Sequence, residues 1–338
     1  MYVRSLFKTE LSNKALKIKS FQAISLASLC AVGILAGILI LQQIYSGYYD
    51  TLVSILVIII SYGVGAAFIM WLSLLFLSWY KSSHSFIIFL YFISTLVIAF
   101  NLVTTAAWAS AKLSPPHPIG EYVGSSGEAS GVSFLLLNEI YRISTFMSFF
   151  SIWITTAILM NNYREKLINA IVYWVILSIP FVYFVVTYFY QYFIGGMLTS
   201  YLANDPVTVS IILGAFLSLS KPIGGLVFGI AFWKISTIVS YEKRIRTYMI
   251  ICGWGIFLIF ATNQVATQVV TPYPPFGLAT LTVLNTAGYL MLLGIYGSAT
   301  LVSANANLRR SIHKHALESK LLNLIGHAEF ERDTKDRR

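Results

Sequence analysis

Long apolar runs separated by short polar stretches fill the chain from residue 21 to residue 303. Eight of these runs each supply the ~20 apolar residues that a helix needs to cross roughly 30 Å of hydrocarbon. They are Phe21–Gln43, Leu52–Tyr80, Ser85–Ser110, Ser133–Met160, Leu167–Tyr192, Pro206–Thr237, Tyr248–Thr271 and Gly277–Ser303. The pattern predicts an all-α, polytopic integral membrane protein with eight transmembrane helices.

Both ends of the chain differ from this transmembrane domain of residues 21–303. Residues 1–20 alternate basic and apolar side chains, which favours an interfacial segment on the cytoplasmic face. Residues 304–338 are charged, and their apolar positions predict a short amphipathic cytoplasmic helix that could pack on the cytoplasmic loops, on another membrane subunit or on a second copy of the chain. These positions, at 4-3-4 spacing, are Leu317, Leu321, Leu324 and Ala328.

Composition and charge support a membrane location. Hydrophobic residues make up 57% of the chain and charged residues 11%, which excludes a soluble protein with a single core. All but three of the 23 Lys and Arg residues flank the predicted spans on the side of the two termini, the exceptions being Lys112, Arg142 and Lys221. This bias predicts a multi-pass cell-membrane protein with both termini cytoplasmic. It also accounts for the net charge of +10, so we expect contact with anionic lipid headgroups and not with nucleic acid.

Short sequence matches suggest an internal repeat of residues 21–160 and 167–303. The matched segments are Asp50-Thr51-Leu52-Val53 with Asp205-Pro206-Val207-Thr208, Asn101-Leu102-Val103-Thr104-Thr105 with Asn263-Gln264-Val265-Ala266-Thr267, and Leu137-Asn138 with Leu284-Asn285. Matching segments run in the same direction, which predicts two parallel four-helix halves. The alternative is chance similarity between apolar sequences of similar composition.

Amide side chains gather in the halves of the helices that are predicted to face outside. This placement predicts an outward-facing polar cavity for a small polar or anionic ligand, which the long loop 111–131 would either cover as a lid or simply bypass. The alternative is that the amides only join helices through hydrogen bonds worth ~0.6 kcal/mol each. The candidate ligand-binding residues, with one carboxylate, are Asn101, Glu139, Asn263, Gln264, Gln268 and Asn285. The alternative for Glu139 is a local ion pair with Arg142, which lies three residues away on the same helix face.

Lys221 lies in the middle of the sixth apolar run. A charge at the centre of a bilayer costs at least ~2.5 kcal/mol, so it needs a functional reason. Ser218 shares its helical face, and both are candidate ligand-binding residues, with Lys221 near the floor of the cavity. Pro222 removes one backbone hydrogen bond and is followed by Gly224 and Gly225, which predicts a hinge.

The spans contain no HExxH, GxSxG or P-loop motif and no paired intramembrane Asp. The sequence therefore predicts neither an enzyme nor a metal or cofactor site. The segments Lys221-Pro222-Ile223-Gly224-Gly225 and Pro272-Tyr273-Pro274-Pro275-Phe276-Gly277 resemble motifs of multi-spanning archaeal membrane proteins without assigned function. The resemblance covers about the second half of the chain, and it implies a membrane location and no activity.

Three function classes fit these features. The first is a receptor or sensor, in which a ligand in the outer cavity alters the kink at Pro222 and so the cytoplasmic side. The second is a transporter or facilitator for a small solute. Coupled transporters usually carry acidic residues near the membrane midplane, and the spans offer none there, so the receptor is preferred. The third is a structural subunit of a membrane complex.

Overall fold

The computed structural model describes residues 2–46, 50–113, 132–161, 170–189, 206–238, 243–269, 274–304 and 320–335. Within these ranges every element is an α-helix, which confirms the all-α fold. The helices are α1 (Tyr2–Ser46), α2 (Thr51–Ser83), α3 (Phe86–Leu113), α4 (Val132–Asn161), α6 (Ala170–Tyr188), α9 (Pro206–Ile238), α10 (Lys243–Val269), α11 (Pro274–Ala304) and α13 (Lys320–Lys335).

Six helices, within the part of the chain that the structure describes, are long and apolar enough to cross a membrane. They are Lys19–Ser46, Thr51–Ser83, Phe86–Leu113, Phe134–Asn161, Lys243–Thr267 and Thr280–Ala304. The fold is therefore that of a multi-pass membrane protein, but the predicted count of eight spans is not reproduced. The predicted fifth and sixth runs correspond to α6 and α9. Among the described residues, the apolar part of α6, Trp174–Tyr188, is shorter than a full span, and α9, 33 residues long, is not one of the six.

Local signals set the ends of α2. Asp50 caps its N-terminus, because the Asp50 carboxylate accepts a hydrogen bond from the backbone N–H of Leu52 at 2.8 Å. At the other end His84 adopts a left-handed conformation with φ of 50° and donates its backbone N–H to the carbonyl of Tyr80 at 2.8 Å. This reversal lets α3 begin two residues later and pack against α2.

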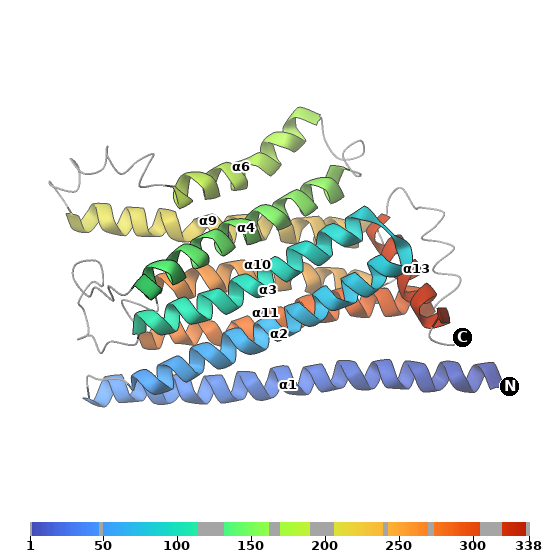
Figure 1. The fold of residues 1–338 in the computed structure, drawn as a ribbon, viewed down its shortest axis with the longest axis horizontal. Coiled ribbons are helices and arrows are strands. Elements are labelled where there is room, and N and C mark those ends of the chain that lie inside the picture. Colours follow the sequence, from blue (N-terminus) through green and yellow to red (C-terminus); the bar gives the residue numbers. More distant parts are fainter. Residues whose placement is uncertain are drawn as a thin grey trace.

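The helices form a bundle in which α1 and α6 flank opposite sides (Figure 1). Consecutive pairs α2–α3, α3–α4, α9–α10 and α10–α11 pack together, and the contacts α2–α11 and α4–α9 join the two series. α1 lies against α2 and α11, as α6 lies against α9 and α4. This pairing pattern is the one that two parallel four-helix halves would give; the internal repeat itself stays a prediction until the halves are superposed.

Large apolar side chains cover the outside of the bundle. Ile44 in α1 is 70% exposed and Leu52 in α2 is 76% exposed. A surface of this kind is stable against lipid and not against water. Residues 2–20 continue into the first span as part of one uninterrupted helix, and whether these first turns lie in the interface stays a prediction.

Glycines mark the closest helix contacts. A Cβ on Gly229 of α9 would lie 2.7 Å from the carbonyl oxygen of Gly253 in α10, and a Cβ on Gly253 would lie 2.8 Å from the carbonyl oxygen of Gly229. Gly65, with a small-residue spacing from Ser61 in α2, faces Leu284 and Gly288 of α11. Small residues at both crossings, α9–α10 and α2–α11, therefore let the helix backbones come into close contact. The similar spacing of Gly33 and Gly37 in α1 serves no such contact, since no atom of the described residues lies within 4 Å of a Cβ built at either glycine.

α13 folds back onto the end of the bundle where α2 and α3 meet (Figure 1). Leu321 and Ala328 of the predicted apolar seam are buried and Leu324 is half-buried, whereas Leu317 lies outside the described residues. Glu329 is fully buried: it accepts a hydrogen bond from Trp79 Nε1 at 2.7 Å and pairs with Arg332 at 2.8 Å. The predicted C-terminal helix is thus confirmed, and it docks on its own chain.

Candidate functional site

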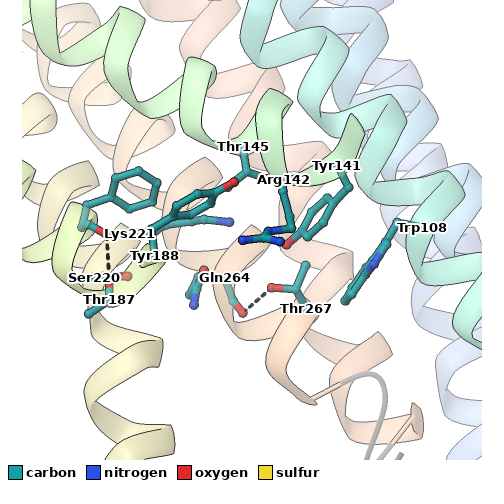
Figure 2. A pocket seen from close by; sticks show the side chains of 11 residues that line it. Trp108, Tyr141, Arg142, Thr145, Thr187, Tyr188, Ser220, Lys221, Gln264 and Thr267 are labelled. Carbon is teal, nitrogen blue, oxygen red and sulfur yellow. Dashed lines mark hydrogen bonds between the residues drawn. The ribbon is translucent and has the colours of Figure 1, made fainter. Parts of the chain in front are cut away.

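A cavity of about 260 Å³ opens between α3, α4, α6, α9 and α10, in the half of the bundle away from α13 (Figure 2). Its walls combine cations, aromatic rings and hydroxyl groups. The lining residues are Trp108, Tyr141, Arg142, Thr145, Phe184, Thr187, Tyr188, Ser220, Lys221, Gln264 and Thr267. None of these described lining residues carries a carboxylate, so the charged groups that face the cavity are cationic.

Lys221 reaches the cavity from the middle of α9. It lies about 22 Å along that helix from Pro206, at a rise of 1.5 Å per residue, and is only 5% exposed. Among the described residues, no carboxylate lies within ion-pair distance of Lys221. A buried ammonium without a counterion is costly in hydrocarbon, and an anion in the cavity would lower that cost.

Arg142 brings a second cation from α4. Its guanidinium pairs with Glu139 at 3.1 Å, which confirms the expected i,i+3 ion pair, and its Cζ lies 5.9 Å from the ring centre of Tyr188. The Glu139 side chain is 56% exposed and lies outside the cavity lining. Arg142 is 35% exposed, so it stands at the mouth of the cavity, while Lys221 is buried deeper. Figure 2 shows both side chains extending into the same space.

Aromatic rings form the remaining walls. Trp108 and Tyr141 stack with centroids 4.5 Å apart and planes 15° from parallel. The indole N–H of Trp108 donates to Asn138 Oδ1 at 3.0 Å, which fixes the orientation of the ring. Tyr188 and Phe184 of α6 complete the aromatic lining. The cavity therefore offers flat apolar faces beside its cations.

An aromatic cluster closes the cavity toward the other half of the bundle. Phe149 lies one turn beyond Thr145 in α4, is fully buried, and stacks on Phe184 at 4.0 Å. Phe228 of α9 and Phe260 of α10 pack on Phe149 at 5.2 and 5.9 Å. A Cβ on Gly224, three residues after Lys221, would meet the ring of Phe149, which is outside the cavity lining. The cluster therefore bounds the cavity on the side of Lys221 that faces the rest of α9.

A hydrogen-bond network supports the wall behind the cavity. Tyr62 donates to Asn263 Oδ1 at 2.9 Å, and Asn263 Nδ2 donates to Asn101 Oδ1 at 3.4 Å. Asn101 Nδ2 in turn donates to Ser144 Oγ at 3.1 Å and to Thr145 Oγ1 at 3.0 Å. Thr145 lines the cavity, whereas Asn101 and Asn263 do not. The two amides connect α2, α10, α3 and α4 and hold one wall residue in place.

The structure brings only some of the sequence-predicted site residues together. Lys221 and Gln264 both line the cavity, and Glu139 touches it only through Arg142. Ser218 is half-buried and outside the lining. The side chain of Gln268 and the loop residues 114–131 lie outside the described part of the chain.

Asn285 is buried in α11 and does not line the cavity. Within the described structure, neither atom of its amide group has a hydrogen-bond partner. The proposed hinge residues lie in an uninterrupted α9, where Gly224 packs against the ring of Phe149 and Gly225 against Phe260. The hinge stays a prediction.

Sequence reasoning missed most of the wall. Arg142 drew attention only as the partner of Glu139, and the four aromatic residues of the lining, Trp108, Tyr141, Phe184 and Tyr188, were not among the predicted site residues. A depth comparison could have found them, because Trp108, Tyr141 and Tyr188 lie in the same half of their helices as Gln264. Of the described residues, no three His, Cys, Asp or Glu are grouped so that they could hold a metal ion.

Comparisons with protein-family models, with curated proteins and with solved structures found no match to this chain. The resemblance to archaeal membrane proteins therefore stays a prediction.

Proposed function

We propose that the chain is a receptor- or sensor-like membrane protein whose cavity binds a small anion, with Lys221 as the principal binding cation. One observation carries the proposal: Lys221 is 5% exposed, faces the cavity, and pairs with no carboxylate of the described residues. An ammonium in such a place is stabilised most by an anionic ligand. Arg142 at the mouth is paired with Glu139, so Lys221 is the lining cation that an anion would reach unpaired.

The proposal includes the placement of the chain in the membrane. α6 and α9 would cross the bilayer beside the six apolar helices, which gives eight spans. The distribution of Lys and Arg favours cytoplasmic termini in the cell membrane, with anionic headgroups bound near them. The cavity would then open to the outside and α13 would lie in the cytoplasm, which is the arrangement that a sensor of external ligands requires.

α9 would carry the response. Lys221 is followed by Pro222, which has no backbone N–H to donate to the helix. Ligand contact with Lys221 would alter the helix at that point, and α9 extends from there to Ile238 at the end of the bundle that holds α13.

The binding test uses the full chain in lipid nanodiscs, with sodium benzoate, acetate, succinate and phosphate as probes in isothermal titration calorimetry. We expect at least one anion to bind, and Lys221→Met to weaken that binding at least tenfold. Lys234→Met is the matched control, since Lys234 lies in the same helix and is exposed. If no anion binds, or if both variants bind like the wild type, the cavity is not an anion site.

A flux test separates the receptor from the transporter. The protein is reconstituted in liposomes, and uptake of the radiolabelled anion that binds best is followed. A receptor binds without uptake. Uptake that Lys221→Ala abolishes would refute the receptor proposal and support the transporter.

A further inference from the structure

From the charge, walls and size of the cavity we infer that its ligand is a small aromatic monocarboxylate, whose carboxylate meets Lys221 and whose ring lies between the aromatic walls. This inference rests on the proposed function, because it assumes that an anion binds in the cavity. It adds the charge number, the shape and the size of that anion.

The charge balance favours a single negative charge. Arg142 already has Glu139 at 3.1 Å, so its charge is largely compensated at the mouth. Lys221 has no such partner among the described carboxylates. Of the two cations that line the cavity, only Lys221 is uncompensated, which matches one carboxylate; Lys112 is outside the lining, with its Nζ 4.4 Å from the ring centre of Trp108. A second anionic group would have to compete with Glu139 for Arg142.

The hydrogen-bond donors of the cavity wall also favour binding of the carboxylate at Lys221. The hydroxyl of Thr187 donates to the carbonyl of Phe184 at 2.9 Å, and the hydroxyl of Thr267 donates to the carbonyl of Gln264 at 2.9 Å (Figure 2). Both hydrogens are thus committed to the helix backbones. The ammonium of Lys221 keeps its N–H groups for a ligand, so a carboxylate would bind there.

The walls favour a flat ring for the rest of the ligand. The Trp108–Tyr141 stack lies on one side, and Tyr188 and Phe184 come from α6 on another. Aromatic faces attract other rings in stacked or edge-on arrangements, with about 0.5–1.5 kcal/mol beyond simple burial. An aliphatic acid of the same charge would not gain this energy.

The volume limits the size. A cavity of about 150 Å³ holds one benzene molecule, and this cavity has about 260 Å³. A single ring with a carboxylate and a few further atoms fills about this volume, whereas a nucleotide, a peptide or a lipid chain would extend beyond it. The aromatic cluster around Phe149 prevents the ligand from extending deeper.

The test compares four probes on the full chain in nanodiscs by isothermal titration calorimetry. Benzoate is the expected ligand class, acetate lacks the ring, benzyl alcohol lacks the charge, and terephthalate carries a second charge. We expect benzoate to bind at least tenfold more tightly than each of the other three. Trp108→Leu should weaken benzoate at least fivefold and leave acetate unchanged. Trp254→Leu is the control, because Trp254 is 46% exposed in α10 and lies outside the cavity.

The results separate this inference from the proposed function. Acetate binding as tight as benzoate, lost in Lys221→Met, would overturn the aromatic ligand and leave the anion site. Terephthalate binding more tightly than benzoate would overturn the single charge. If benzyl alcohol binds like benzoate, in the wild type and in Lys221→Met, both the aromatic-carboxylate inference and the proposed anion site are overturned. If Trp108→Leu shows a lowered melting temperature, Tyr188→Leu replaces it with the same expectation.

Discussion

The buried carboxylate of Glu329 should hold α13 on the bundle. Its side chain is 0% exposed, accepts the indole N–H of Trp79 at 2.7 Å and pairs with Arg332 at 2.8 Å. The change Glu329→Ala leaves that N–H without an acceptor and the guanidinium without its partner. Breaking a buried ion pair costs ~3–5 kcal/mol. Because the Arg332 side chain is 22% exposed and can regain water, we expect about 3 kcal/mol.

Hydrogen exchange followed by mass spectrometry measures this loss directly. A cost of about 3 kcal/mol lowers the protection of α13 amides by roughly 100-fold, since 1.4 kcal/mol is a factor of ten. Amides in the middle of α10 should keep their protection, because α13 can detach while the bundle stays folded. The chain is studied in nanodiscs so that the apolar surface of the bundle remains covered.

Glu331→Ala is the matched control. Glu331 lies two residues away in the same helix, is 36% exposed, and pairs with His327 at 3.1 Å. An exposed pair is worth ~0–1 kcal/mol, so the protection of α13 should change by less than about fivefold. Equal protection in the Glu329 and Glu331 variants would refute the claim that the buried carboxylate anchors the helix. Trp79→Phe removes the indole N–H and also part of a fully buried ring, so it should lower the protection of α13 as well.

Two further predictions concern packing and buried amides. Gly229→Val should lower the melting temperature strongly, by an overpacking cost of ~1–3 kcal/mol, because its Cβ would lie 2.7 Å from the Gly253 carbonyl oxygen. Gly33→Val is the control and should leave the melting temperature nearly unchanged, since nothing lies within 4 Å of a Cβ at that position. Equal melting temperatures of the two variants would contradict the close contact. Asn263→Leu should destabilise the protein by roughly 1 kcal/mol, because it removes the hydrogen-bond acceptor of the Tyr62 hydroxyl. Asn285→Leu should be neutral or stabilising, since its amide has no partner among the described residues. Thermal unfolding in detergent measures both variants, and a larger loss for Asn285→Leu would show that Asn285 has a polar role.

Apolar length predicted the helices well and their ends less well. The sixth run, Pro206–Thr237, begins where α9 begins and ends one residue before it. Pro206 suits the first helical position, because an N–H there would have no partner within the helix. The first run was placed at Phe21–Gln43, yet α1 begins at Tyr2. Hydropathy marks where a helix can be in lipid, and it does not mark where the helix stops.

Which side of each helix faces the interior of the bundle was harder to predict than the presence of the helix. In a soluble helix the apolar stripe identifies the buried side, but in lipid both sides of the helix are apolar. Depth alone therefore grouped Gln264, which lines the cavity, with Asn101 and Asn263, which join helices. Lys221 was predictable because a charge has few tolerable places in a membrane. Arg142 was not, since a nearby Glu139 already explained it.

The reciprocal contact between Gly229 and Gly253 has a mechanical consequence. With each carbonyl oxygen less than 3 Å from the place of the other's Cβ, the backbones of α9 and α10 meet at this crossing with no side chain between them. A movement of α9 toward α10 there meets backbone, which yields less than the end of a side chain. α4 and α6 meet α9 through aromatic rings: Phe149 of α4 packs on Phe228 and Gly224, and Tyr183 of α6 packs on Phe216. A ring edge shifts more easily than a backbone. The compliant seam of the bundle is therefore the one that borders the cavity, between α4 and α6 on one side and the α9–α10 pair on the other.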